Sequence, residues 1–232
     1  MKITLPDGSR RELADGSSGL DLASDIGPGL AKAAVAVIVN GIQKDLSDPI
    51  DQDSEVSIIT IDSDEGLEIM RHTLTAQVLA RAVKNLYPDT KLAIGPTIAD
   101  GFYYDFEFKK AISPDDLASI EKEMKKIISN GSSITKTLHS KSDAMNIFKG
   151  VNESYKESII SESEQDDNFQ LYYQDNNEFV DLCRGPHLPS IKHIGAFRLT
   201  KLAGAYWKGD SKNKMLTRIY GTAWKNDKEL NA

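Results

Sequence analysis

An Asn-Gly pair placed after a β-branched run is the feature that most constrains the fold of this chain. Residues 33–39 are apolar and rich in Val, and Asn40-Gly41 follows them directly. Asn-Gly between two extended segments is the strongest short-range signal of a two-residue hairpin turn. An antiparallel pair is therefore expected here, and the apolar segment 56–61 supplies a further strand for the same sheet.

The residues before this run predict one more hairpin and one helix. Alternating residues 2–5 and 10–13 flank a Pro-Asp-Gly-Ser turn. Ser17-Ser18 can cap a short helix over 20–26, and the cluster Gly27-Pro28-Gly29 ends it. The order of strand, strand, helix, strand, strand, strand predicts a first domain made of a small sheet packed on one helix.

A polar link at residues 63–66 places the domain boundary after residue 62. A helix is expected over 67–87, and another begins at Ser113-Pro114 with Ser113 as its N-cap and stops near Asn130-Gly131. The remaining pattern predicts helices at 142–149 and 153–161, a hairpin within 91–108, and strands at 136–140, 171–173, 178–181, 196–202 and 216–220. The second domain, residues 63–226, is therefore predicted to be α+β, with an antiparallel sheet flanked by helices.

The charge distribution permits an RNA partner without requiring one. The net charge of the chain is -7, which by itself disfavours contacts with phosphate. Residues 190–226, however, contain eight Lys and Arg residues against the single acid Asp210, interleaved with aromatic residues that can stack on bases. The alternative is a sheet edge with solvated lysines and core aromatics, and composition alone leaves both readings open.

Composition also bears on the cellular compartment. No segment approaches the roughly 20 continuous apolar residues of a membrane span, and the N-terminus lacks the apolar core of a secretory signal. A single cysteine cannot form an internal disulfide. We therefore expect a chain without membrane contact in a reducing cytoplasm.

The segment Asp181-Leu182-Cys183-Arg184-Gly185-Pro186-His187 most strongly suggests chemistry. It holds the only cysteine of the chain and one of its four histidines, with three residues between them. His72 lies far earlier, on a face of the expected helix that is otherwise apolar. Together these residues predict a Cys/His pocket built from two distant segments. The structural alternative for His72, a hydrogen-bonded histidine on a helix face, stays open.

Seven segments, in order along the second domain, carry a family resemblance: Met70-Arg71-His72, Ala93-Ile94-Gly95-Pro96, Gly101-Phe102-Tyr103-Tyr104-Asp105, Glu153-Ser154-Tyr155-Lys156, Asp181 to His187, Ala203-Gly204-Ala205-Tyr206-Trp207 and Arg218 to Trp224. In these segments residues 63–226 resemble the editing domain of bacterial threonyl-tRNA synthetase. Residues 1–62 resemble a TGS domain, which is a ubiquitin-like β-grasp. The two resemblances span nearly the whole chain.

The resemblance implies an N-terminal fragment of a longer enzyme, in which residues 227–232 begin a linker to an aminoacylation domain that this chain lacks. It implies hydrolysis of serine from the 3′ end of mischarged tRNA(Thr), because a synthetic site for threonine discriminates against a missing methyl by only about 1–3 kcal/mol. For editing it implies no cofactor. For the parent enzyme it implies ATP, magnesium and zinc in the aminoacylation domain, and a homodimer formed through that domain.

The resemblance also suggests catalytic residues. His72 is expected to position the attacking water or accept its proton, because imidazole titrates near neutral pH. Cys183 is expected to orient the water or bind substrate, and His187 to share the same wall. The alternative is a nucleophilic Cys183 activated by His187, which requires a thiolate.

Four further residues are expected to bind substrate. Lys156 is assigned to the terminal ribose or phosphate, and Asp181 to the α-ammonium group of the serine. Tyr104 and Arg184 are assigned to the pocket. Without the resemblance, Lys156 reads as a solvated charge, Asp181 as a strand-end cap and Tyr104 as a core residue.

One position departs from the family pattern. The family carries His-x-x-x-His on the first helix, and the second position here is Ala76. Gln77 is adjacent, but it lies about 100° further round an α-helix, so it is not expected to replace a histidine there without distortion of the helix. We therefore expect weakened editing, and the alternative is a non-catalytic tRNA-binding or regulatory module. His72, Cys183 and His187 remain as a partial ligand set, but the resemblance implies no metal for editing.

Overall fold

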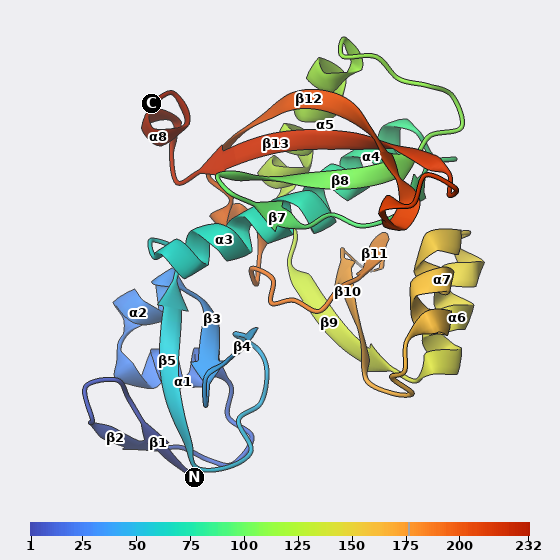
Figure 1. Cartoon of the computed structure of the whole chain (residues 1–232). Coiled ribbons are helices and arrows are strands. Elements are labelled where there is room, and N and C mark those ends of the chain that lie inside the picture. Colours follow the sequence, from blue (N-terminus) through green and yellow to red (C-terminus); the bar gives the residue numbers. More distant parts are fainter. Residues whose placement is uncertain (176) are drawn as a thin grey trace.

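The computed structural model describes residues 1–175 and 177–232, which form two α+β domains (Figure 1). The first domain contains β1 (Lys2–Thr4), β2 (Arg10–Glu12), α1 (Gly19–Ile26), α2 (Pro28–Ala33), β3 (Ala34–Val39), β4 (Ile42–Asp45) and β5 (Ser54–Thr60). Its sheet has the order β2-β1-β5-β3-β4, with β1 and β5 parallel and the other neighbours antiparallel. The predicted β-grasp is confirmed.

Local sequence signals explain most of this domain. Asn40 and Gly41 both have positive φ, 48° and 82°, and join β3 to β4 in the register that pairs Val39 with Ile42. Ser18 caps α1 and shares a capping box with Asp21. The Gly-Pro-Gly cluster ends α1 as expected, but the short helix α2 was not predicted; Pro28 begins it, since its fixed φ suits the first turn.

The predicted link at residues 63–66 is also wrong. Ser63 caps a helix that starts at Asp64, so the two domains are joined within a few residues. Gly66 lies against the end of β5, where an added Cβ would come within 2.1 Å of the Thr60 carbonyl oxygen. The absence of a side chain at Gly66 therefore lets the helix begin directly on the first domain.

One long helical segment starts the second domain. It comprises α3 (Asp64–Thr73), a π-helical turn η1 (Leu74–Leu79) and α4 (Ala80–Leu86). Later helices are α5 (Asp116–Asn130), α6 (Lys141–Gly150), α7 (Ser154–Glu162) and α8 (Asp227–Leu230), with short 3₁₀ turns η2 (Ile191–His193) and η3 (Trp207–Gly209). The helix expected from Ser113-Pro114 thus starts at Asp116, whose carboxylate accepts from the Ser113 amide.

The strands of the second domain form two antiparallel sheets, whereas the sequence predicted one. The larger sheet has the order β12 (Ala196–Tyr206), β13 (Met215–Trp224), β8 (Gly101–Glu107), β6 (Lys91–Leu92), with β7 (Thr97–Ile98) also on β8. The smaller sheet has the order β11 (Phe179–Leu182), β10 (Phe169–Gln174), β9 (Ile134–His139). The turn expected between β10 and β11 includes Asn176, which lies outside the described residues.

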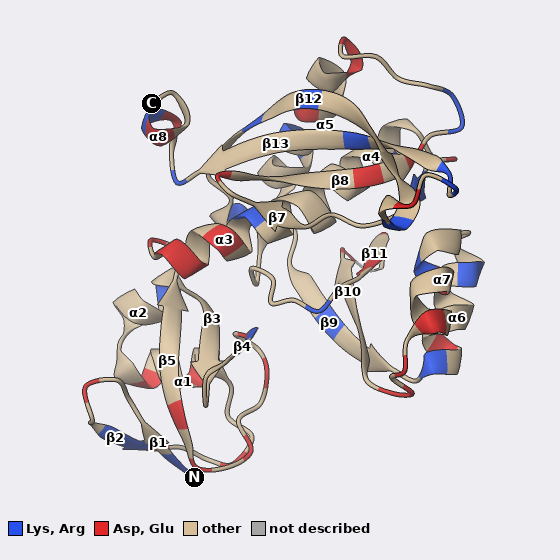
Figure 2. Cartoon of the chain, in the orientation of Figure 1, with Lys and Arg blue, Asp and Glu red and all other residues tan. Residues whose placement is uncertain are grey.

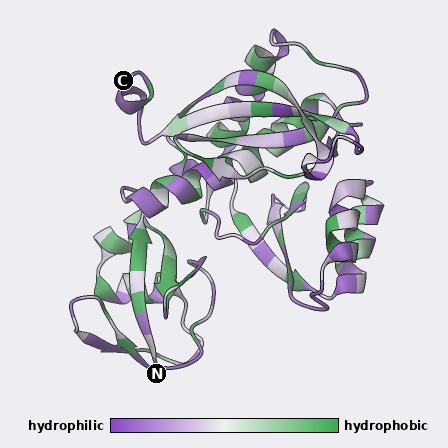
Figure 3. Cartoon of the chain, in the orientation of Figure 1, coloured by the Kyte–Doolittle hydropathy of each residue, from purple (hydrophilic) through white to green (hydrophobic). Residues whose placement is uncertain are grey.

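The two domains share part of one hydrophobic core. Val35, Ala36 and Ile59 of the first domain belong to the same buried cluster as Ile69 and Met70 of α3. A second cluster fills the rest of the first domain, and a third lies between α6, α7 and the smaller sheet. Figure 3 shows the corresponding apolar strands β3 and β5 below α3. The shared cluster fixes the first domain against the helix that carries His72.

Among the described residues, each helix is too short or too polar to cross a bilayer.

We expect Gly66→Ala to destabilise the chain by about 1–3 kcal/mol, because the new Cβ forces α3 away from the Thr60 carbonyl. Denaturant unfolding followed by circular dichroism measures the change. Gly29→Ala in α2 is the matched control, since an added Cβ there meets nothing within 4 Å. Equal stability of the two variants would contradict the close packing at the junction.

Candidate functional site

The structure brings His72 and Cys183 into direct contact. His72 lies in the last turn of α3, and Cys183 follows the last residue of β11. The distance from His72 Nε2 to Cys183 Sγ is 2.7 Å, although 111 residues separate them in the sequence. The predicted meeting of the two distant segments is therefore present in the fold.

His187 is buried next to this pair, on the face of the His72 ring. Its ring stacks on that of His72, with centroids 4.6 Å apart and an interplanar angle of 5°. Its Nδ1 is 3.0 Å from the Thr73 hydroxyl, which also accepts from the Leu188 amide. Its Nε2 is buried and has no hydrogen-bond partner among the described residues. Thr73 was not predicted as a site residue, because no local sequence pattern distinguishes it.

The loop between Cys183 and His187 is tightly shaped. Gly185 has φ +63°, and the Gly185-Pro186 peptide bond is cis. The Gly185 amide donates to Cys183 Sγ at 3.2 Å. A Cβ on Gly185 would lie 2.0 Å from the Tyr172 hydroxyl. The rings of Tyr172 and His187 meet edge to face, with centroids 4.5 Å apart. Both φ and space therefore require glycine here.

Burial sets the charge state of these three side chains. It lowers the pKa of His72 to about 4 and, together with the nearby His72, lowers the pKa of His187 well below its usual value. Burial also raises the pKa of the Cys183 thiol to about 12. At neutral pH the site therefore holds two neutral imidazoles and a thiol, and a thiolate–imidazolium pair is opposed from both sides.

Asp181, Lys156 and Tyr104 form a buried polar group next to the thiol. The Lys156 ammonium lies 2.8 Å from Asp181 Oδ1, and the Tyr104 hydroxyl donates to Asp181 Oδ2 at 2.9 Å. The Leu182 amide also donates to Oδ1. Burial, followed by the charge of Asp181, raises the pKa of Tyr104 well above its usual value. Both Asp181 oxygens are thus engaged, and its contact with a substrate ammonium stays a prediction.

A cavity of about 650 Å³ opens beside the thiol. Lys156, Cys183 and Arg184 line it, and Arg184 is exposed at its mouth. The remaining wall comes from α7, the segment after it, β10 and β11, and includes Ile159, Ser163, Asn168, Gln170 and Leu182. These wall residues were missed, because no local motif marks them. His72 and His187 do not line this cavity, and Cys183 is the link between it and the two imidazoles.

The helix after His72 does not have α geometry. Residues 74–79 form a π turn, in which hydrogen bonds run from i to i+5, as from the Ala80 amide to the Thr75 carbonyl. This turn holds one residue more than an α turn. Side chains along it are therefore shifted relative to α spacing, which brings Gln77 nearer to the row of His72 than a regular helix would. The assumption of a regular helix, which set Gln77 aside, is wrong.

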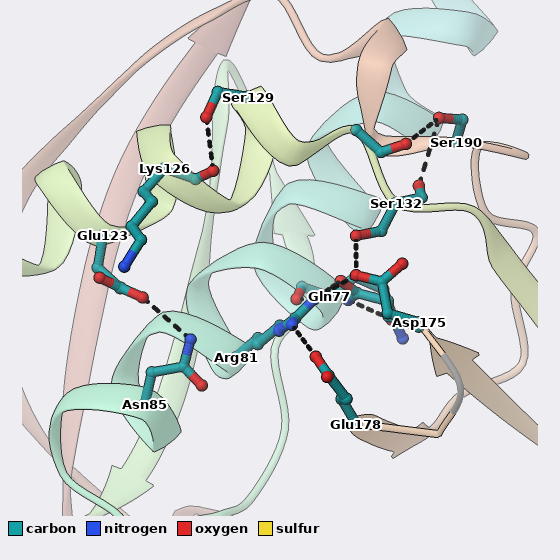
Figure 4. A network of polar contacts seen from close by, with 12 residues as sticks. Gln77, Arg81, Asn85, Glu123, Lys126, Ser129, Ser132, Asp175, Glu178 and Ser190 are labelled. Carbon is teal, nitrogen blue, oxygen red and sulfur yellow. Dashed lines mark hydrogen bonds and ion pairs between the residues drawn. The ribbon is translucent and has the colours of Figure 1, made fainter.

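Gln77 belongs to a buried amide network (Figure 4). Gln174 Nε2 donates to both the carbonyl and the side-chain oxygen of Gln77 at 2.8 Å. Arg81 donates to Gln174 Oε1 and pairs with Asp175 and Glu178. Gln174 lies two residues along β10 from Tyr172, which contacts His187, so the network borders the site. Gln77 Nε2 is buried without a partner among the described residues.

His72, Cys183 and His187 are the three possible ligands of a metal ion at this site. His72, Cys183 and His187 offer ligand atoms that all lie within 4.8 Å of one another. Zinc bound at its usual distances of roughly 2.0–2.3 Å holds tetrahedral ligands more than about 3 Å apart, and it needs a thiolate. The His72–Cys183 contact of 2.7 Å and the raised thiol pKa do not fit that requirement without rearrangement.

Three of the eight basic residues in segment 190–226 are paired with acids. Lys208 pairs with Glu162, Lys214 with Glu107, and Arg218 with Asp105. Figure 2 shows basic segments of β13 beside acidic ones of β8. The reading as a sheet with paired charges thus accounts for these three residues, and the other five form no ion pair among the described residues. An RNA partner has to be argued from other features.

Family models match part of each domain. The family model "Threonyl and Alanyl tRNA synthetase second additional domain" matches residues 170–220, and the TGS domain model matches residues 1–60. Over 230 residues the chain is 51% identical to a threonine–tRNA ligase of Hahella chejuensis and 49% to that of Prochlorococcus marinus. It is 52% identical over 234 residues to that of Paramagnetospirillum magneticum. These matches cover 99–100% of the chain but only 36% of each relative, so the chain spans about a third of their length.

We expect stability to fall as the pH drops from 6.5 to 4, because the unfolded chain then takes up a proton at His72 that the folded chain refuses. Above pH 6.5 this contribution is fully present, and by pH 4 about 3 kcal/mol from His72 is lost. His187 acts in the same direction. Denaturant unfolding at several pH values, for the natural chain and for His72→Gln, isolates the contribution of His72 to stability, since the carboxylates titrate in both chains. Parallel pH curves for the two chains would contradict the lowered pKa.

Proposed function

Because this chain combines a TGS domain with a threonyl and alanyl tRNA synthetase second additional domain, we propose that it hydrolyses serine from mischarged tRNA(Thr). The relatives that match it along its length are threonine–tRNA ligases. A ligase for threonine needs such a step, because a pocket that accepts threonine gains only about 1–3 kcal/mol against a substrate lacking one methyl. The observation that carries the proposal is the His72–Cys183 contact beside a cavity of about 650 Å³.

The reaction is the addition of water to the seryl ester. A water held between Cys183 and the ester attacks the carbonyl carbon. Because His72 does not line the cavity, the proton of the water passes to Cys183 Sγ as the thiol proton moves to the neutral Nε2 of His72. The bond from the acyl carbon to the ribose oxygen then breaks, and the proton returns to that oxygen. The products are serine and tRNA(Thr) with a free terminal hydroxyl, so no other reactant is needed.

Water is favoured over the Cys183 thiolate as the nucleophile. A thioester route needs the thiol proton to move to an imidazole before attack. The raised pKa of Cys183 and the lowered pKa values of His72 and His187 all oppose that transfer. Attack by water needs no charged pair beforehand, since its proton moves toward the neutral imidazole only as the bond to the carbonyl carbon forms.

Lys156 and Arg184 supply positive charge to the end of the tRNA. Both line the cavity, and Lys156 is held in place by Asp181 and by the Tyr104 ring, 5.5 Å from its ammonium. We assign Lys156 to the terminal ribose or phosphate and Arg184 to the cavity mouth. Asp181 and Tyr104 then support Lys156, and Asp181 meets the serine ammonium only by sharing its Oδ1 or Oδ2 with it.

The missing second histidine weakens proton transfer in this proposal. Ala76 cannot donate or accept a proton, and the amide of Gln77, which takes that place in the π turn, is not a base at neutral pH. Gln77 Nε2, which has no hydrogen-bond partner among the described residues, can still orient a neighbouring group by donating a hydrogen bond to it. His72 alone then takes up the proton of the water.

The rest of the reaction cycle is proposed to lie outside these residues. The whole ligase would charge tRNA(Thr) with threonine, use ATP, magnesium and zinc in its aminoacylation domain, and form a homodimer through that domain. Residues 227–232, in which α8 lies, are proposed as the start of the connection to it.

We expect His72→Ala to slow single-turnover release of serine from seryl-tRNA(Thr) by about 100-fold or more, because the proton acceptor is gone. Cys183→Ala should leave a measurable rate, since water and His72 remain. The control is His139→Ala, whose ring bonds Thr137 on its own strand β9 and does not line the cavity.

Intact-mass spectrometry during turnover separates the two nucleophiles. The water route predicts no seryl adduct on Cys183, and a trapped adduct that disappears in Cys183→Ala would establish the thioester route instead. Binding of seryl-tRNA(Thr) with no serine release by the natural chain would favour a non-catalytic tRNA-binding module.

We expect Gln77→His to raise the rate of serine release several-fold and Ala76→His to leave it unchanged or lower it, because the π turn puts residue 77 in the row after His72. Ala76 is 4% exposed, so an imidazole there has to displace neighbours. The same tRNA assay compares both variants. A gain only for Ala76→His would show that the helix keeps α spacing in solution.

A further inference from the structure

The first domain reaches the site through the carboxylate of Asp45, at the end of β4. Asp45 is 6% exposed, and all three of its side-chain partners belong to the second domain. Oδ1 accepts from the His187 amide at 2.9 Å, and Oδ2 accepts from the Tyr172 hydroxyl at 2.7 Å and pairs with Lys136 at 3.2 Å. The site residues are thus bonded to a part of the chain more than one hundred residues away.

Two of these partners determine where the His187 ring lies. The amide that Asp45 accepts from belongs to His187 itself, directly after the Gly185-Pro186 bend. The Tyr172 hydroxyl donates to Asp45, and the Tyr172 ring packs edge to face with the His187 ring at an interplanar angle of 86°. The same hydroxyl occupies the space beside Gly185 that a Cβ would fill. One carboxylate therefore holds both the backbone and the ring neighbour of His187.

The contacts continue across the smaller sheet to the cavity. Lys136, Tyr172 and Asp181 are directly opposite one another on β9, β10 and β11, so their side chains share one face. Asp45 closes one end of this row, and at the other end Asp181 holds Lys156, which lines the cavity. A displacement at Asp45 would thus reach both His187 and Lys156.

A buried ion pair is weak evidence of stabilisation, because removing charges from water offsets most of the attraction between them. The position of Asp45 is better explained by placement of its partners. The shared core of Val35, Ala36 and Ile59 with α3 already fixes the first domain, so the carboxylate has a rigid support.

We propose that Asp45 is a positioning residue for the loop from Cys183 to His187, so that the first domain completes the editing site. The inference rests on the proposed hydrolysis of seryl-tRNA(Thr). It assigns the first domain a role in the reaction without any contact with substrate.

The test compares three variants of the full chain. Asp45→Ala removes every contact, and Asp45→Asn keeps an oxygen that can accept from the His187 amide. Asp48→Asn is the matched control, because Asp48 pairs with Lys136 and accepts from the Asp45 amide but does not touch His187 or Tyr172. Single-turnover release of serine at saturating and at low protein concentration separates the rate of the step from binding.

We expect Asp45→Ala to lower the saturated rate by roughly tenfold to 100-fold, since small misplacements of reacting groups cost that much. Asp45→Asn should recover most of this loss, and Asp48→Asn should stay within about twofold of the natural chain. A purely structural role predicts instead that rate follows melting temperature across all three variants. Saturated rates for Asp45→Ala within about twofold of the natural chain would overturn the proposal.

Imidazole NMR keeps the test independent of activity. The chain has four histidines, so their ring signals can be assigned by single substitutions. Asp45→Ala should shift the signals of His187 and its stacking partner His72, and Asp48→Asn should not. If the natural chain released no serine, the proposed function would fail, while unmoved His187 signals in Asp45→Ala would separately refute the positioning role.

Discussion

The helix from Asp64 to Leu86 is the element on which the other parts of the site depend. Its first turn rests on the end of β5 through Gly66, and its last α-helical residues, His72 and Thr73, contact the loop that contains Cys183 and His187. Further along, Arg81 ties it to the β10–β11 hairpin. Because one rigid element carries all these contacts, the separation between the two domains and the separation between the two imidazoles are set together.

Burial gives the cluster its chemical character. An exposed histidine and cysteine side by side favour an ion pair, as in thiol hydrolases, but here the low-polarity surroundings oppose charge on both groups. Charge is confined instead to the neighbouring group of Lys156 and Asp181, where each partner neutralises the other. The fold thus separates a neutral thiol–imidazole region from a region that holds a buried ion pair.

Much of this arrangement follows from short-range patterns, and the rest depends on contacts that such patterns cannot contain. The Asn40-Gly41 turn and the capping box at Ser18 are local, and both form as predicted. The meeting of His72 with Cys183 was inferred from unusual residue types and a family resemblance. Asp45 was missed because its partners are distant in sequence and a lone acid at a strand end has no distinctive pattern. The π turn was missed because helical spacing was assumed to be 3.6 residues throughout.

The π turn also affects how chains of this kind can be recognised. One additional residue within a helix changes the interval between two side chains on the same face from four to five without changing the face. A search pattern written with a fixed gap would pass over this chain, or would record a loss at Ala76, whereas we propose that Gln77 takes that position. Alignments through such helices are therefore better anchored on buried contacts, such as the one between Gln77 and Gln174, than on residue counts.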